Sequence, residues 1–158
     1  MVAARIIVGL HALVFAASAV RKAKDLQSAE GHFLMGVGKL YPGWMLPIAF
    51  AHESTILGLL YVDRPMAMVA SAAFIGGICH AQSTPVGPWA KLGPKLLIPV
   101  AIVILTTVAL ALTAADSAGP ISRRLGLDRL SSIGLLLTGL ATGAAGATFA
   151  AALAAANK

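Results

Sequence analysis

Three ionisable side chains lie near the middle of apolar stretches of this sequence, and their residue types are the ones best suited to do chemistry there. Glu53 stands in the middle of the apolar stretch 44–62 with His52 beside it, and His11 stands in the stretch 2–20. A charged side chain at the centre of a bilayer costs about 2.5–3.5 kcal/mol on insertion scales, so such residues usually face other helices and serve a pathway, a ligand or a structural contact. With a rise of about 1.5 Å per residue in antiparallel helices, all three side chains reach a similar depth. We therefore predict an intramembrane polar cluster of His11, His52 and Glu53.

This cluster admits three interpretations. The simplest is a hydrogen bond between His11 and Glu53 that fixes two helices in register and catalyses nothing. A second is a polar element beside a quinone or along a proton path. A third is ligation of haem or chlorophyll by His11 and His52. We predict no catalytic residue and no metal site, because the segment that starts at His52 begins like the zinc-protease motif HExxH but has Ile56 in place of its second histidine.

Composition predicts an integral membrane protein. Of the 158 residues, 58% are hydrophobic and 11% are charged, and the mean hydropathy is +0.86, which is too apolar for a soluble domain of this length. Five stretches each approach the ~20 residues that a helix needs to cross the hydrocarbon core. They are 2–20, 44–62, 65–81, 95–115 and 131–155. We therefore predict an all-α fold, a polytopic membrane bundle of five transmembrane helices, whose first helix is retained because no signal-peptide cleavage pattern is followed by a soluble domain.

The basic residues flank the apolar stretches. The net charge is +6, and the position of these residues in connections predicts anionic phospholipid headgroups, and not nucleic acid, as their partners. Five crossings put seven basic residues on one side and five on the other, which slightly favours an amino terminus outside the cytosol or matrix. One side carries Arg21, Lys22, Lys24, Lys39, Lys91, Lys95 and Lys158, and the other carries Arg5, Arg64, Arg123, Arg124 and Arg129.

Two further polar residues follow the only cysteine of the chain. Because Cys79 stands alone, an internal disulfide and a CxxC redox pair are excluded within one chain. His80 and Gln82 lie near the end of the third stretch, where we predict interfacial polar residues. We expect a hydrogen-bonded imidazole at His80, with ligation of a cofactor in a neighbouring subunit as the alternative.

The last stretch is rich in small residues. Gly134, Gly139, Gly143 and Gly146 stand among alanine and threonine, and the middle two form a GxxxG motif. Such residues let helix backbones approach closely. We predict helix-packing positions at all four glycines, either against the chain's own helices or against another subunit.

Three short motifs in the second and third stretches carry a family resemblance. They are Tyr41-Pro42-Gly43-Trp44, then Glu53 followed by Gly58-Leu59-Leu60, then Gly76-Gly77-Ile78-Cys79-His80-Ala81. This pattern resembles the DoxX-like family of small four-helix integral membrane proteins over residues 5 to about 112. The resemblance implies that Glu53 and His80 occupy the family's characteristic polar positions. It also implies a DoxX-like bundle over 1–115, to which this chain adds a polar loop over 116–130 and a Gly/Ala-rich transmembrane helix over 131–158.

The resemblance and the composition together give an expected function. Some DoxX-like proteins are associated with quinone-linked sulfur oxidation or membrane oxidoreductase assemblies, but this chain has no evident soluble oxidising domain and no redox cysteine pair. We expect an accessory, non-catalytic subunit of a large bioenergetic complex of the respiratory-chain type, which stabilises assembly, binds phospholipid and other membrane subunits, and carries no intrinsic cofactor. The expected location is the mitochondrial inner membrane, with a bacterial plasma membrane as the alternative. The alternative function is a quinone-linked oxidoreductase component or a haem- or pigment-binding membrane subunit.

Overall fold

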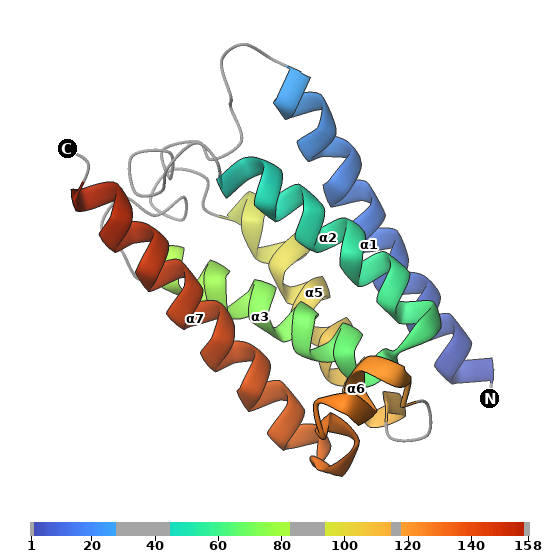
Figure 1. Ribbon diagram of the computed structural model, residues 1–158. Helices are drawn as coiled ribbons and strands as arrows, with labels where there is room; N and C mark the ends of the chain where they lie inside the picture. Colours follow the sequence, from blue (N-terminus) through green and yellow to red (C-terminus); the bar gives the residue numbers. More distant parts are fainter. Residues whose placement is uncertain (1, 28–44, 83–93, 115–117, 157–158) are drawn as a thin grey trace.

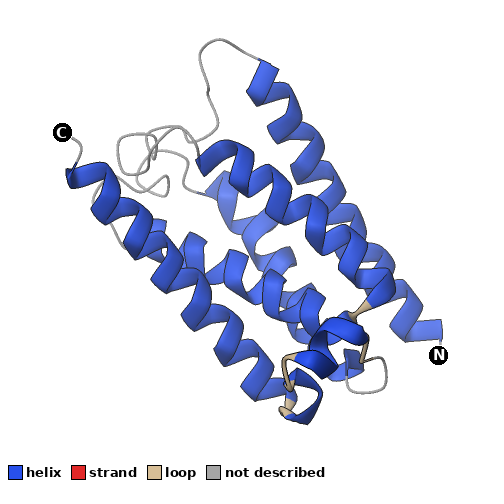
Figure 2. Cartoon of the chain, in the orientation of Figure 1, coloured by secondary structure: helices blue, strands red, loops and turns tan. Residues whose placement is uncertain are grey.

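The computed structural model describes residues 2–27, 45–82, 94–114 and 118–156, and within these ranges every regular element is a helix (Figure 2). In chain order the elements are α1 (Val2–Gln27), α2 (Met45–Val62), α3 (Arg64–Gln82), α5 (Pro94–Ala114), the short α6 (Pro120–Arg124), the 3-10 helix η3 (Leu127–Arg129) and α7 (Ser132–Ala156). The predicted all-α fold is confirmed at this level. The motif at residues 41–44 lies outside the described residues.

The five long helices fall on the five apolar stretches, but their ends differ from the predicted ones. The first stretch ends at residue 20, whereas α1 continues to Gln27. Its last residues are arginine, lysine, alanine, leucine and glutamine with one aspartate, most of which are good helix formers. Hydropathy marks where a helix stops being apolar and not where it stops being a helix.

One described helix, α7, is long and apolar enough to cross a membrane. It has 25 residues, and two shorter apolar helical segments accompany it, Pro47–Val62 and Ala101–Ala111. Length and composition thus support membrane association of α7 in its own right.

The helix α3 occupies the middle of the bundle (Figure 1). It packs most extensively against α7 and also contacts α2 and α5, while α1 packs against α2 and α5. Between these helices lies a core of fully buried apolar side chains. Its largest members are Phe15, Ile56, Leu60, Met68 and Leu110.

Small residues bring α3 and α7 into close contact. A Cβ atom at Gly139 would overlap the carbonyl oxygen of Val69, and one at Gly143 would overlap that of Ala73. On the opposite side of the contact, a Cβ atom at Gly76 would overlap the carbonyl oxygen of Leu140. Backbone therefore meets backbone here, which only glycine permits, and the GxxxG motif packs inside this chain.

The other two predicted packing glycines do not take part in this contact. A Cβ atom at Gly146 would meet nothing within 4 Å, and one at Gly134 would meet the side chains of Leu130 and Ser131 at 3.5 Å, from the turn that precedes its own helix. Only the middle pair of the four glycines thus faces a neighbouring helix.

The stretch 116–130, predicted as a polar loop, contains α6 and η3 in its described part. It is tied to the turn between α2 and α3 by Asp63, which is 1% exposed. One carboxylate oxygen of Asp63 accepts from the backbone N–H of Ser122 at 2.7 Å, and the other accepts from that of Met66 at 3.3 Å. The second bond caps the start of α3, since it satisfies an N–H that has no partner within the helix. One buried acid thus fixes both a helix start and the position of α6.

Hydrogen bonds also set the ionisation of Asp63. Burial by itself raises the pKa of a carboxylic acid, but hydrogen bonds from Ser122, Met66 and Gly119 outweigh it and hold the pKa of Asp63 below its ordinary value of 3.8. The carboxylate is therefore charged at neutral pH.

Candidate functional site

His11 lies at the point where α1, α3 and α5 meet. Its side chain is completely buried, and each ring nitrogen has a hydroxyl partner. Nδ1 lies 2.8 Å from Oγ1 of Thr106 on α5, and Nε2 lies 2.8 Å from Oγ of Ser71 on α3. One imidazole thus joins three helices.

The number of hydrogens at His11 and its two partners determines which group donates in each hydrogen bond. Ser71 Oγ also donates to the carbonyl oxygen of Ala67 at 2.8 Å, and Thr106 Oγ1 donates to that of Ile102 at 2.8 Å. A hydroxyl has one hydrogen, and a neutral imidazole has one N–H. Therefore one hydroxyl accepts from the ring while the other turns from its helix carbonyl and donates to the ring. Both neutral tautomers satisfy both ring nitrogens.

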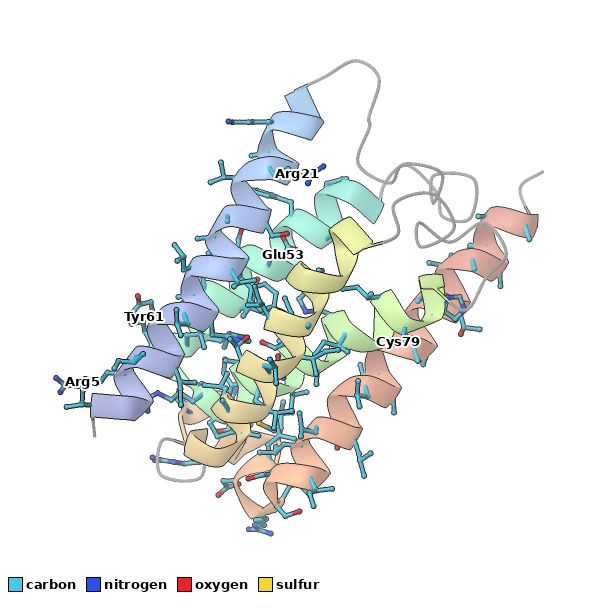
Figure 3. All side chains as sticks on the ribbon, turned by 180° about the vertical axis from the view of Figure 1, so that it is seen from behind. Arg5, Arg21, Glu53, Tyr61 and Cys79 are labelled. Carbon is cyan, nitrogen blue, oxygen red and sulfur yellow. The ribbon has the colours of Figure 1, made fainter. Side chains whose placement is uncertain are left out.

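Glu53 makes its contact elsewhere. It is completely buried, and its Oε1 accepts a hydrogen bond of 2.8 Å from Oγ of Ser18 on α1. Figure 3 shows the carboxylate inside the bundle. The predicted hydrogen bond between His11 and Glu53 is wrong, because both nitrogens of His11 are occupied by hydroxyls.

Helix register explains this error. The depth estimate took the two helices as antiparallel and started each at its own interface, at the ends of the apolar stretches 2–20 and 44–62. In the structure Ser18 lies opposite Glu53, and α1 and α2 run antiparallel (Figure 1). His11, seven residues before Ser18, is therefore displaced from the level of Glu53 by about 10 Å along the helix.

His52 forms a third, separate contact. Its Nε2–H donates to the carbonyl oxygen of Ala70 on α3 at 2.7 Å, and the ring is half-buried. Two phenylalanines stand between the histidines: His11 lies 4.8 Å from Phe15, Phe15 lies 5.5 Å from Phe74, and Phe74 lies 6.3 Å from His52, measured between ring centroids. The predicted cluster is thus three helix contacts around an aromatic core.

This geometry bears on haem ligation. A ring nitrogen that ligates iron must present a lone pair, and both nitrogens of His11 are engaged. Joint ligation by His11 and His52 would require His11 to break a hydrogen bond and the intervening rings of Phe15 and Phe74 to move apart. Within the described residues no group of three His, Cys, Asp or Glu side chains has the arrangement of a metal site.

The residues predicted near the end of α3 are only partly described. His80 is half-buried and has an interaction partner, and Cys79 beside it is exposed. Gln82 is the last residue of α3, and its side chain lies outside the described residues. The hydrogen bonds described above for His11, His52 and Glu53 are made with other residues.

Sequence patterns missed the partners that carry this site. Ser18 and Ser71 are single serines in apolar helices, and Thr106 is one of two adjacent threonines in another, both common occurrences. One available signal was helix periodicity, because Ser71 lies one turn from both Ala67 and Ile75, two buried residues of the same helix face. A polar residue on such a face needs a partner from another helix.

Comparison with known proteins gives no further guide to this site. No family model, no curated protein and no solved structure matches the chain significantly.

Proposed function

We propose that the five long helices cross a bilayer and that the protein is an accessory, non-catalytic subunit of a large membrane complex. The observation that carries this proposal is the different placing of apolar and ionisable side chains. The outward faces of the long helices are apolar, whereas His11, His52 and Glu53 point into the bundle and hold helices together.

The outward apolar faces run over several helices. Leu13 on α1, Leu105 on α5 and Ile133 on α7 are 66%, 68% and 69% exposed. On α1 these exposed side chains follow helical spacing at Val2, Ile6, Leu10, Leu13 and Val20. Water-soluble monomers rarely expose apolar surface on this scale, whereas lipid tails solvate it well.

The hydrogen bonds of the exposed hydroxyls also fit a lipid environment around the helices. Ser54, Thr55, Thr138, Thr142 and Thr148 each donate to the carbonyl oxygen four residues earlier in their own helix. In hydrocarbon no water is available to satisfy a hydroxyl, so it must bond to its own helix or to a neighbour.

The contacts of the buried polar residues favour a structural role over a catalytic one. His11 links α1, α3 and α5, Glu53 links α2 to α1, and His52 links α2 to α3. Interhelical hydrogen bonds of this kind hold transmembrane helices together. We include the DoxX-like resemblance in this proposal. We also propose that the complex is of the respiratory-chain type and lies in the mitochondrial inner membrane, with a bacterial plasma membrane as the alternative.

A seam of small residues on α7 fits a neighbouring helix. Its spacing alternates between three and four residues, as in helices that pack side by side. It is outward-facing and consists of Thr138, Ala141, Ala145, Thr148 and Ala152, all exposed. Large apolar side chains such as Leu137 and Phe149 flank it. Since Gly139 and Gly143 are already used against α3, this seam is where a helix of another subunit would pack.

Native electrophoresis of membranes solubilised in mild detergent tests the proposal. The wild-type chain should migrate with a large complex that contains respiratory subunits. Ala145→Leu should release it, because a leucine in the seam keeps a neighbouring helix away. The matched control is Ala17→Leu, at an exposed position on α1. Migration of the wild-type chain alone, or equal loss with both variants, contradicts the proposal.

The second candidate function is a proton-conducting element of a quinone-linked oxidoreductase. It is favoured by the contacts of His11, because both ring nitrogens have a hydroxyl partner in either neutral tautomer. A proton that enters at one ring nitrogen can therefore leave from the other. His11→Gln separates the two functions. If quinone-dependent turnover of the complex falls while assembly persists, the proton path is supported; if assembly fails and residual complex has normal turnover per molecule, the structural role holds. A purified chain with a Soret band would instead support the haem-binding alternative.

A further inference from the structure

Arginines gather at one end of the bundle. Five of the six arginines in the chain belong to the start of α1, the turn before α3 and the segment of α6 and η3, which lie at the same end (Figure 1). They are Arg5, Arg64, Arg123, Arg124 and Arg129. Figure 3 shows Arg5 and Tyr61 toward this end, far from Arg21 at the opposite end. Tyr61 is 80% exposed, as expected of an aromatic residue at a membrane interface.

The segment of α6 and η3 is held firmly at this end. Asp63 accepts from the backbone of Ser122, and a Cβ atom at Gly119 would overlap the carbonyl oxygen of Val62. The segment is therefore packed directly on the end of α2. When the long helices cross a bilayer, this packing places α6 at the level of the headgroups.

A hollow of about 330 Å³ opens on α6, lined by Pro120, Ile121, Arg124 and Leu125. Three of the four lining residues are apolar, and Ile121 and Leu125 are exposed. The guanidinium of the neighbouring Arg123 is turned away to the carbonyl oxygen of Ala118, at 2.8 Å. Within the described part of the chain, the guanidinium of Arg124 has no hydrogen-bond or ion-pair partner. The hollow thus combines one available cation with an apolar wall.

We propose that this hollow binds an anionic glycerophospholipid. The lipid phosphate lies against the guanidinium of Arg124, and the upper part of an acyl chain lies against Ile121 and Leu125. A guanidinium matches the planar spacing of two phosphate oxygens and binds them through two parallel hydrogen bonds. The charge of this end adds attraction, because five arginines stand there against Asp63 and the exposed Asp128 among the described residues. The inference rests on the proposed membrane insertion.

The test is lipid retention by the purified full-length chain. The chain is placed in nanodiscs of phosphatidylcholine in which about one lipid in five is phosphatidylglycerol. These discs present both zwitterionic and anionic headgroups to the protein. Native mass spectrometry then counts the lipids that remain bound after release. The wild-type chain should retain phosphatidylglycerol several-fold more than its share of the disc. Arg124→Gln should remove that enrichment, and Arg124→Lys should keep part of it because the charge remains.

The matched control is Arg129→Gln, which removes an exposed arginine from the same end but outside the hollow. Enrichment that survives Arg129→Gln and is lost in Arg124→Gln supports the site. No enrichment in the wild-type chain, equal loss in both variants, or displacement of the lipid by millimolar inorganic phosphate overturns it. Failure of the chain to enter the nanodisc is a different result, which contradicts the membrane bundle itself.

Discussion

Ser18 donates a hydrogen bond of 2.8 Å to the carboxylate of Glu53, and this contact joins α1 to α2 inside the bundle. It gives the acid in the middle of an apolar helix a structural partner. Together with the two hydroxyl contacts of His11 and the carbonyl contact of His52, it gives each ionisable side chain of the predicted polar cluster a contact with another helix.

The first prediction concerns this contact. Ser18→Ala should lower the free energy of unfolding by about 0.6 kcal/mol, the average found for interhelical hydrogen bonds in a membrane protein, and by no more than about 1.7 kcal/mol, the largest value found there. Glu53→Gln should cost less, because its amide oxygen can still accept from Ser18. Denaturation in mixed detergent micelles measures both values. A larger loss for Glu53→Gln than for Ser18→Ala would mean that the charge of Glu53 matters beyond the Ser18 contact.

The second prediction compares two glycines of α7. Gly143→Ala places a methyl group on the carbonyl oxygen of Ala73 and should destabilise the fold by about 1–3 kcal/mol, as overpacking does. Gly146→Ala meets open space and should be neutral or stabilise by up to about 1 kcal/mol through helix propensity. Unfolding of both variants in the same detergent is the measurement. Equal effects would contradict the close contact of α3 and α7.

The third prediction concerns a buried hydroxyl on α5. Thr107 is fully buried, and its Oγ1 has no hydrogen-bond partner within the described residues. Leaving such a group unsatisfied costs about 1–3 kcal/mol, so Thr107→Val, which keeps the shape, should raise the melting temperature. The control is Thr106→Val, which removes the partner of His11 Nδ1 and should lower it. A fall in the melting temperature of Thr107→Val would show that this hydroxyl has a partner in the membrane.

The fourth prediction follows from the ionisation of Asp63. Hydrogen bonds from Ser122, Met66 and Gly119 overcome the opposing effect of burial and lower the folded-state pKa of Asp63 below 3.8. A group whose pKa is lower when folded stabilises the fold above its unfolded pKa. That contribution should be complete above about pH 5 and should be lost as the pH falls below 3.8 toward the folded pKa.

Thermal unfolding between pH 2 and 6 measures this effect. Asp63→Asn should be less stable than the wild-type chain at pH 6, and the difference should narrow as the pH falls. A constant difference across this range would indicate that Asp63 does not change its ionisation on unfolding.

Sequence patterns located the helices because hydropathy and length are properties of single segments. They could not give the register of α1 against α2, because register depends on how two surfaces fit together. The partners of His11 were missed for that reason. The predicted register was wrong by about two helical turns, so it put Glu53 beside His11, where the structure has Ser71 and Thr106. The two glycines of the GxxxG motif lie in a close helix contact, but a motif on one helix does not say which helix it faces, and here it faces α3.

The structure assigns different surroundings to six residues that the sequence suggested as site or packing residues. His11, His52 and Glu53 hold helices together, Gly139 and Gly143 pack on α3, and His80 lies apart near the end of α3. The availability of Arg124 and the seam on α7 became visible only once the burial of their neighbours was known, because an exposed arginine or alanine has no distinctive sequence pattern.

The number of membrane crossings tests the central claim most directly. Five crossings place the two ends of the chain on opposite sides of the bilayer, so in sealed vesicles a protease outside should remove a tag from one end and leave the tag at the other end intact. Digestion should become complete at both ends when detergent opens the vesicles. Protection of both tags, or removal of both from sealed vesicles, would contradict a bundle in which all five long helices cross the membrane.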